Sequence, residues 1–114
     1  MELIYKIVPE DLWHQAELTG SFAGSSTDQA DGFIHLSTTA QVRGTAARYY
    51  AGQNGLLLVG VDPKLVSADL RYEPSSGGAL FPHLYAPLKL DAVVSVKALL
   101  LDADGQHQFD DGFP

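Results

Sequence analysis

The side chains with the clearest chemical potential stand close together at positions 31–38, where the sequence is DGFIHLST. Residues Gly32–Ser37 are predicted to form a β-strand. Alternate side chains of a strand share a face and lie about 6.5–7 Å apart, so Phe33, His35 and Ser37 point the same way. These three side chains would form a ligand wall, because the ring can pack against another ring while the imidazole and hydroxyl bond to hydroxyls or phosphate oxygens. The pattern also fits a half-buried histidine beside a serine that caps the following helix.

A second polar group lies on the short strand predicted at Leu70–Glu73. Arg71 and Glu73 share one face of this strand, and Tyr72 lies on the other. A carboxylate beside a guanidinium stays ionised, so Glu73 would accept a hydrogen bond from a sugar hydroxyl rather than act as a general acid. The alternative is a solvent-facing ion pair, worth about 0–1 kcal/mol.

A third group lies between two prolines, Pro82 and Pro87, which stiffen the backbone around His83 and Tyr85. These two side chains share a face if the segment is extended. The preceding loop, residues 74–78, is rich in serine and glycine and could close over a pocket. The alternative is a strained edge strand with Tyr85 packed in the core.

The predicted elements that position these groups alternate strands with two helices in the first half of the chain. Strands are expected at Leu3–Val8, Gly32–Ser37, Leu56–Val61, Leu70–Glu73 and Ala92–Leu101, and helices from Pro9 to Gly20 and from Thr38 or Thr39 to about Ala51. Residues Ser21–Asp31 are expected to form a polar loop. The prolines restrict Leu80–Leu90 to an edge strand or irregular structure, and Asp102–Gly105 is predicted to form a hairpin-like turn. The pattern predicts an α+β fold with a mixed, mostly antiparallel sheet.

Length and composition narrow the class of protein. The chain has 114 residues, so residues 1–114 are expected to form a single domain, and its 46% hydrophobic content can supply a core. The net charge of −7 argues against broad nucleic-acid binding and against an anionic membrane surface. The absence of cysteine excludes disulfides and thiolate metal sites. The N-terminus lacks the pattern of an export signal, so a cytoplasmic protein is expected.

Compact motifs for dinucleotide, phosphate or zinc binding and for serine hydrolases are absent from the sequence. The separated polar groups leave three hypotheses open. The cleft could bind a nucleotide-type small molecule, or His35, His83 and Glu73 could hold a metal ion in a metal-assisted hydrolase or isomerase. The third hypothesis is a non-enzymatic binding module that uses the same cleft. No feature of the sequence specifies an oligomeric state.

Several of these stretches together resemble a mostly bacterial family, the domain-of-unknown-function family nine hundred and fifty-two. The resemblance covers essentially the whole chain and rests on Trp13 after the first strand, residues 31–37, Glu73-Pro74 and residues 81–85. Membership implies a fold similar to that of ADP-ribosyltransferases, which hold NAD in a cleft of a split β-sheet.

The resemblance also implies roles for particular residues. His35 and Ser37 match the histidine and hydroxyl that hold an NAD ribose in that fold, whereas Leu36 replaces the usual glycine. Glu73 is the candidate for the late-strand glutamate that acts on the ribose hydroxyl. The favoured hypothesis is therefore a nucleotide-type cleft, with NAD as candidate cofactor and ADP-ribosyl transfer or NAD glycohydrolysis as candidate reaction. Its expected catalytic residues are His35, Glu73 and His83, and its expected ligand-binding residues are Phe33, Ser37, Arg71 and Tyr85.

Overall fold

The computed structural model describes residues 2–75, 77–110 and 113, and it is an α+β fold built on antiparallel strands. The elements are β1 (Ile4–Pro9), α1 (Glu10–Thr19), β2 (Ser21–Phe22), α2 (Ser26–Asp31), β3 (Ile34–His35), β4 (Ser37–Thr38), α3 (Val42–Tyr49), β5 (Leu56–Val61), β6 (Leu70–Pro74), β7 (Leu80–Leu84), β8 (Leu88–Lys89) and β9 (Val93–Leu99), with 3₁₀ segments at Pro63–Asp69 and Leu90–Ala92. Every strand pair within these residues is antiparallel, so the prediction of a mixed sheet is wrong in its parallel part.

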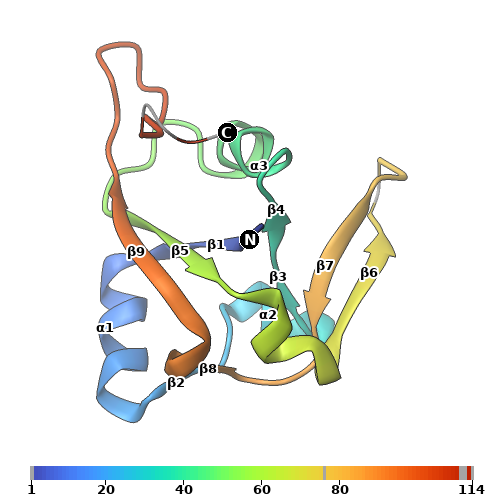
Figure 1. Cartoon of the computed structure of the whole chain (residues 1–114). Helices are drawn as coiled ribbons and strands as arrows, with labels where there is room; N and C mark the ends of the chain where they lie inside the picture. Colours follow the sequence, from blue (N-terminus) through green and yellow to red (C-terminus); the bar gives the residue numbers. More distant parts are fainter. Residues whose placement is uncertain (1, 76, 111–112, 114) are drawn as a thin grey trace.

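A four-stranded sheet in the order β4-β1-β5-β9 carries the core on both of its faces. Side chains of β1 alternate between the faces: Val8 belongs to the cluster with Trp13 of α1, and Ile7 belongs to the cluster with Val42 of α3. In Figure 1, α1 lies below the strands β1 and β5 of this sheet, and α3 lies above them. The two helices therefore cover opposite faces of this sheet.

A three-stranded sheet in the order β3-β7-β6 stands apart from the first, as Figure 1 shows for the β6–β7 hairpin. The prediction of an edge strand for the residues of β7 is wrong, because β7 is the central strand. Pro82 explains why this is possible. Its carbonyl accepts a hydrogen bond of 3.0 Å from the Leu36 amide, but it has no N–H with which to return one. The ladder between β3 and β7 ends there, and the chain continues into β4 of the other sheet.

The predicted strand Gly32–Ser37 is therefore two short strands, β3 and β4, which belong to different sheets. The alternation of its side chains is confirmed, since Ile34 and Leu36 are buried in the core. The split places His35 on one sheet and Ser37 on the other. The two residues consequently contribute to different walls of the space between the sheets.

The prediction of a polar loop at Ser21–Asp31 is wrong, because this segment contains strand β2 and helix α2. Ser25 and Asp28 form a capping box: the Ser25 side chain accepts from the Asp28 amide, and the Asp28 side chain accepts from the Ser25 amide. This exchange satisfies two amides that a helix start otherwise leaves unpaired. The chain thus has three α-helices within its described residues, rather than the two that were predicted.

The start of α3 also differs from prediction, because the helix begins at Val42 and not after Thr38 or Thr39. The side chain of Gln41 explains the delay: its Oε1 accepts from the Thr38 amide at 3.0 Å and its Nε2 donates to the Leu80 carbonyl at 2.7 Å. Gln41 thereby ties the segment before α3 to β7.

The predicted turn at 102–105 is confirmed, with the Asp102 amide bonded to the Gln106 carbonyl at 2.8 Å. Within the residues that the structure describes, no helix has the length and apolarity needed to cross a membrane.

Candidate functional site

A cavity of about 820 Å³ lies between the two sheets, with walls from β1, α2, the β3–β4 segment, α3 and β7. The two imidazoles that sequence analysis singled out both line it, one on β3 and one on β7. His35 and His83 are direct register partners, and their ring centroids are 5.7 Å apart. The cavity therefore brings together residues that lie 48 positions apart in the chain (83 − 35).

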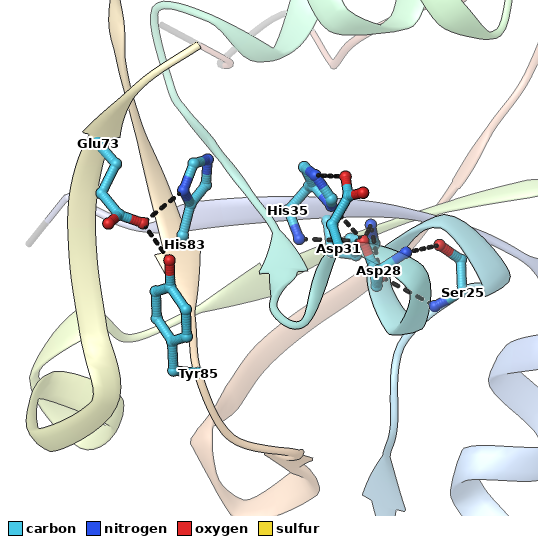
Figure 2. A network of polar contacts seen from close by, with 8 residues as sticks. Ser25, Asp28, Asp31, His35, Glu73, His83 and Tyr85 are labelled. Carbon is cyan, nitrogen blue, oxygen red and sulfur yellow. Dashed lines mark hydrogen bonds and ion pairs between the residues drawn. The ribbon is translucent and has the colours of Figure 1, made fainter.

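Glu73 and His83 form a hydrogen-bonded pair across the β6–β7 hairpin (Figure 2). His83 Nδ1 lies 2.8 Å from Glu73 Oε1, and the Tyr85 hydroxyl donates to the same oxygen at 2.5 Å. A carboxylate has only acceptors, so Nδ1 must carry the proton of this bond. The arrangement fixes both the tautomer and the orientation of the His83 ring.

The two hydrogen bonds also set the protonation of the carboxylate. Donation from Tyr85, and next from His83, lowers the pKa of Glu73 below its ordinary value. The same contact with Glu73 raises the pKa of the Tyr85 hydroxyl. Glu73 is consequently an ionised acceptor at neutral pH and not a proton donor.

The His83 ring is held on its face as well as on its edge. It stacks on the Phe33 ring, with centroids 4.1 Å apart and an angle of 23° between the planes, and His83 as a whole is only 7% exposed. Its second nitrogen, Nε2, has no protein partner within residues 2–75, 77–110 and 113. Figure 2 shows the Nε2 edge turned away from Glu73, and His83 lines the cavity. This nitrogen can form a hydrogen bond with a group bound in the cavity.

His35 is bound differently, because both of its ring nitrogens contact carboxylates. Nδ1 lies 2.6 Å from Asp28 Oδ1 and Nε2 lies 3.0 Å from Asp31 Oδ2 (Figure 2). Both contacts are hydrogen bonds only when both nitrogens carry protons. His35 is therefore held in the cavity wall by two carboxylates, and it offers no free nitrogen to a reacting group.

Asp28 is the centre of this second network. Its Oδ2 lies 3.0 Å from Lys6 Nζ, and it also accepts from the amides of Ser25 and His35. Burial opposes ionisation of Asp28, but the Lys6 ammonium and these hydrogen bonds outweigh it, so the pKa of Asp28 lies below its ordinary value. Burial lowers the pKa of Lys6, against the Asp28 carboxylate, which raises it. The pair joins β1 of one sheet to α2 beside the other.

Ser37 lines the cavity on the side of α3. Its Oγ lies 2.8 Å from Thr45 Oγ1, and Thr45 also donates to the Gln41 carbonyl. The alternative interpretation, in which Ser37 caps the following helix, is therefore wrong. It belongs to a row of hydroxyl and amide groups that faces the cavity from β4 and α3.

The remaining predicted residues lie behind His83 and do not line the cavity. Phe33 packs its ring on His83, so that face is not open to a ligand ring. Arg71 lies with its guanidinium carbon 5.8 Å from the centroid of Tyr85, and no ion pair joins it to Glu73 in the described part of the chain. Both residues support the hairpin that presents His83.

The four charged residues of the cavity wall were missed by the sequence analysis, namely Lys6, Asp28, Asp31 and Arg48. Two of them had a signal. Lys6 lies on the same strand face as Ile4 and Val8, and a lysine among inward-facing aliphatic residues predicts a buried partner. Ser25 three positions before Asp28 is the spacing of a capping box. No signal placed Arg48 in a cavity.

The metal hypothesis finds no cluster to support it among the residues that the structure describes, where no three histidine, aspartate or glutamate side chains are grouped so that they could hold an ion. His35 and His83 face the cavity, but Asp28, Asp31 and Glu73 already occupy three of their four ring nitrogens.

Solved structures of protein CC0527 from Caulobacter crescentus are similar to this chain over nearly its whole length. The crystal structure is 48% identical, covers 93% of each chain and gives a TM-score of 0.89. The solution NMR structure covers 93% of this chain and 91% of that one, with a TM-score of 0.85. No curated protein matches the chain. The chain belongs to the family of proteins of unknown function DUF952, whose profile matches residues 7–96.

Proposed function

We propose that the cavity binds a small nucleotide-type ligand and that His83 is the base that acts on it. The observation that carries the proposal is the state of the His83 ring. Nδ1 is fixed by Glu73 at 2.8 Å and one face of the ring is covered by Phe33, while His83 lines the cavity and its Nε2 has no protein partner among the described residues. A buried imidazole that is oriented by a carboxylate and left open on one side is the arrangement of a general base.

The chemistry follows from the two nitrogens of His83. Nε2 accepts a proton from a ligand hydroxyl or from a water molecule held within about 2.6–3.2 Å. The ring then carries a positive charge, which the ionised Glu73 stabilises through the Nδ1 hydrogen bond. Glu73 is accordingly a positioning residue in this proposal, not the group that touches a ribose hydroxyl.

The lining of the cavity favours a ligand with both a flat ring and hydroxyl groups. Its volume of about 820 Å³ lies in the usual range for small-molecule sites. Tyr49 and Phe81 lie on opposite walls and offer ring surfaces, while Ser37 and Thr45 offer hydroxyls. A nucleotide combines these features.

The narrower form of the proposal makes the ligand NAD or ADP-ribose and the reaction ADP-ribosyl transfer or NAD glycohydrolysis. It is supported by the split between two sheets and by the place of His35 and Ser37 in the cavity wall. In the ADP-ribosyltransferase fold, which the family resemblance implies, His35 matches the histidine that holds a ribose and Ser37 matches the hydroxyl residue two positions after it.

The test is a titration of NAD, ADP-ribose and AMP followed by NMR at the imidazole carbon-bound protons, with nicotinamide release measured in parallel. We expect millimolar ligand or less to shift the His83 signal, and His83→Gln to abolish turnover while ligand still binds. Binding without turnover in the native protein would identify a binding module instead. No shift at His83 with any of the three ligands would overturn the proposal.

A further inference from the structure

We infer that the polar face of α3 binds an anionic group of the ligand, with Arg48 as its anchor. The inference deepens the proposed function and rests on it for the rest of the ligand. It adds a binding site on the wall opposite β7 and an orientation for the bound molecule.

Four residues of α3 and its entry share one side of the helix. Gln41, Gly44, Thr45 and Arg48 are spaced by three, one and three positions, which is the spacing of a single helix face, and all four line the cavity. Val42 and Ala46 lie on the other side and are buried in the core cluster behind it. The helix therefore turns its polar side toward the cavity, with Arg48 as the charged group on that side.

Among the charged side chains that line the cavity, Arg48 differs from the others in its pairing. Lys6 is paired with Asp28, and Asp31 is paired with His35. Arg48 lines the same cavity, but no carboxylate in the described part of the chain forms an ion pair with it. Its guanidinium carbon lies 5.6 Å from the ring centroid of Tyr49. A guanidinium with five donors and no counter-ion fits a phosphate or carboxylate group.

Gly44 supplies the space beside Arg48. No heavy atom lies within 4 Å of the position that a Cβ would take at Gly44, and its backbone angles do not require glycine. Glycine within a helix is less stable than alanine by about 1 kcal/mol. Neither packing nor backbone conformation accounts for glycine here, whereas the close approach of a bulky anion to the helix does.

The orientation that follows puts the anionic group against α3 and the reacting atom near Nε2 of His83, on β7. Helix α3 packs on the four-stranded sheet and β7 belongs to the three-stranded sheet, so one ligand would bridge the split. A phosphate ester or pyrophosphate meets this description best, since the planar guanidinium of Arg48 can donate two parallel hydrogen bonds to its oxygens.

The experiment uses inorganic pyrophosphate as the probe, with acetate as a second probe, and follows the backbone amides of Gly44 and Thr45 and the side-chain Nε–H of Arg48 by NMR. We expect pyrophosphate to shift these signals. Arg48→Ala should weaken the apparent affinity by roughly tenfold or more. Arg43→Ala is the matched control, because it removes the same charge from the same helix but lies outside the cavity lining, and it should change the affinity less than about twofold.

Thermal unfolding of each variant shows that it is folded, and Arg48→Lys, which keeps the charge without the planar fork, should retain part of the affinity. Equal losses in the Arg48 and Arg43 variants, or unshifted α3 signals, would overturn the inference. Shifts with acetate as strong as those with pyrophosphate would support the site and make its ligand group a carboxylate. The NMR signals of α3 do not depend on His83. The experiment can therefore overturn the anion site without overturning the proposal that His83 is the base, and the reverse.

Discussion

The ammonium nitrogen of Lys6 lies 3.0 Å from Oδ2 of Asp28, and the two side chains are 7% and 2% exposed. The pair links β1 to α2, and through Asp28 it also holds His35. Because both charges are removed from water, each one depends on the other for its stabilisation. The wall of the cavity is therefore built on a buried ion pair and not on apolar packing alone.

Removing one partner of this pair should destabilise the fold strongly. Lys6→Met leaves the Asp28 carboxylate buried without its counter-ion, and we expect the free energy of unfolding to fall by about 3–5 kcal/mol. Urea denaturation measures the change. Lys97→Met, which breaks the exposed ion pair with Asp110, is the control and should have a much smaller effect. Similar losses in the two variants would show that burial of the first pair has no energetic consequence.

Asp28 should also contribute to acid unfolding. Its pKa is lowered in the folded protein, so the unfolded chain binds more protons between that folded value and the ordinary value of 3.8. The stabilisation is fully present above the ordinary value and is lost as pH falls through the folded pKa. Urea titrations between pH 7 and pH 2.5 should therefore give Asp28→Asn a shallower dependence on pH than the native protein. Parallel curves for the two proteins would contradict this assignment.

The hydrogen bond from the Tyr85 hydroxyl should keep the pKa of the Glu73 carboxyl low. It is the first cause of the lowered pKa of this carboxyl, so Tyr85→Phe should move the midpoint of its titration upward. The measurement is the ¹³C chemical shift of the Glu73 carboxyl as a function of pH. Tyr72→Phe is the matched control, since Tyr72 lies on the opposite face of β6, and it should leave the midpoint in place.

Glu73 should control which nitrogen of His83 carries the proton. Glu73→Gln removes the charge, and its amide can both donate and accept, so the Nδ1–H tautomer is no longer enforced. We expect the ¹⁵N shifts of the His83 ring to move toward those of mixed tautomers while the thermal midpoint changes little. Ring shifts that stay at their native values would mean that Glu73 does not position His83.

The periodicity of the sequence predicted the parts of the fold that depend on local patterns. The alternation at 33–37 correctly separated His35 from the buried Ile34 and Leu36, and the shared face of His83 and Tyr85 is confirmed by their common acceptor, Glu73. Such features follow from the geometry of one strand.

The features that the sequence did not predict depend on contacts between distant segments. The missing N–H of Pro82 is visible in the sequence and suggested an edge strand. The sequence does not show that this missing donor ends the ladder with β3 and splits the sheet. Similarly, Glu73 was expected to meet a ligand, whereas it binds His83, ten positions further on. Arg48 was not singled out, since nothing in its own helix shows that the opposite β7 wall encloses a cavity. Contacts between segments that are distant in the sequence determine the positions of all three residues.

Two glycines near the cavity should respond to alanine in opposite directions. Gly24 has φ +101°, and a Cβ there would lie 2.8 Å from Cβ of Asp28, so Gly24→Ala should destabilise the protein by about 1–3 kcal/mol or more. Gly44 has open space and ordinary helical backbone, so Gly44→Ala should raise the free energy of unfolding by about 0.5–1 kcal/mol.

The comparison becomes sharper when stability and binding are measured together. Gly44→Ala should weaken pyrophosphate binding while it stabilises the fold, because the added methyl group occupies the space through which an anion approaches α3. Urea denaturation and a pyrophosphate titration on the same preparation give both quantities. A variant that is more stable and binds as tightly as the native protein would show that the glycine is not needed for access. A variant that loses stability would show that the space beside α3 is already filled.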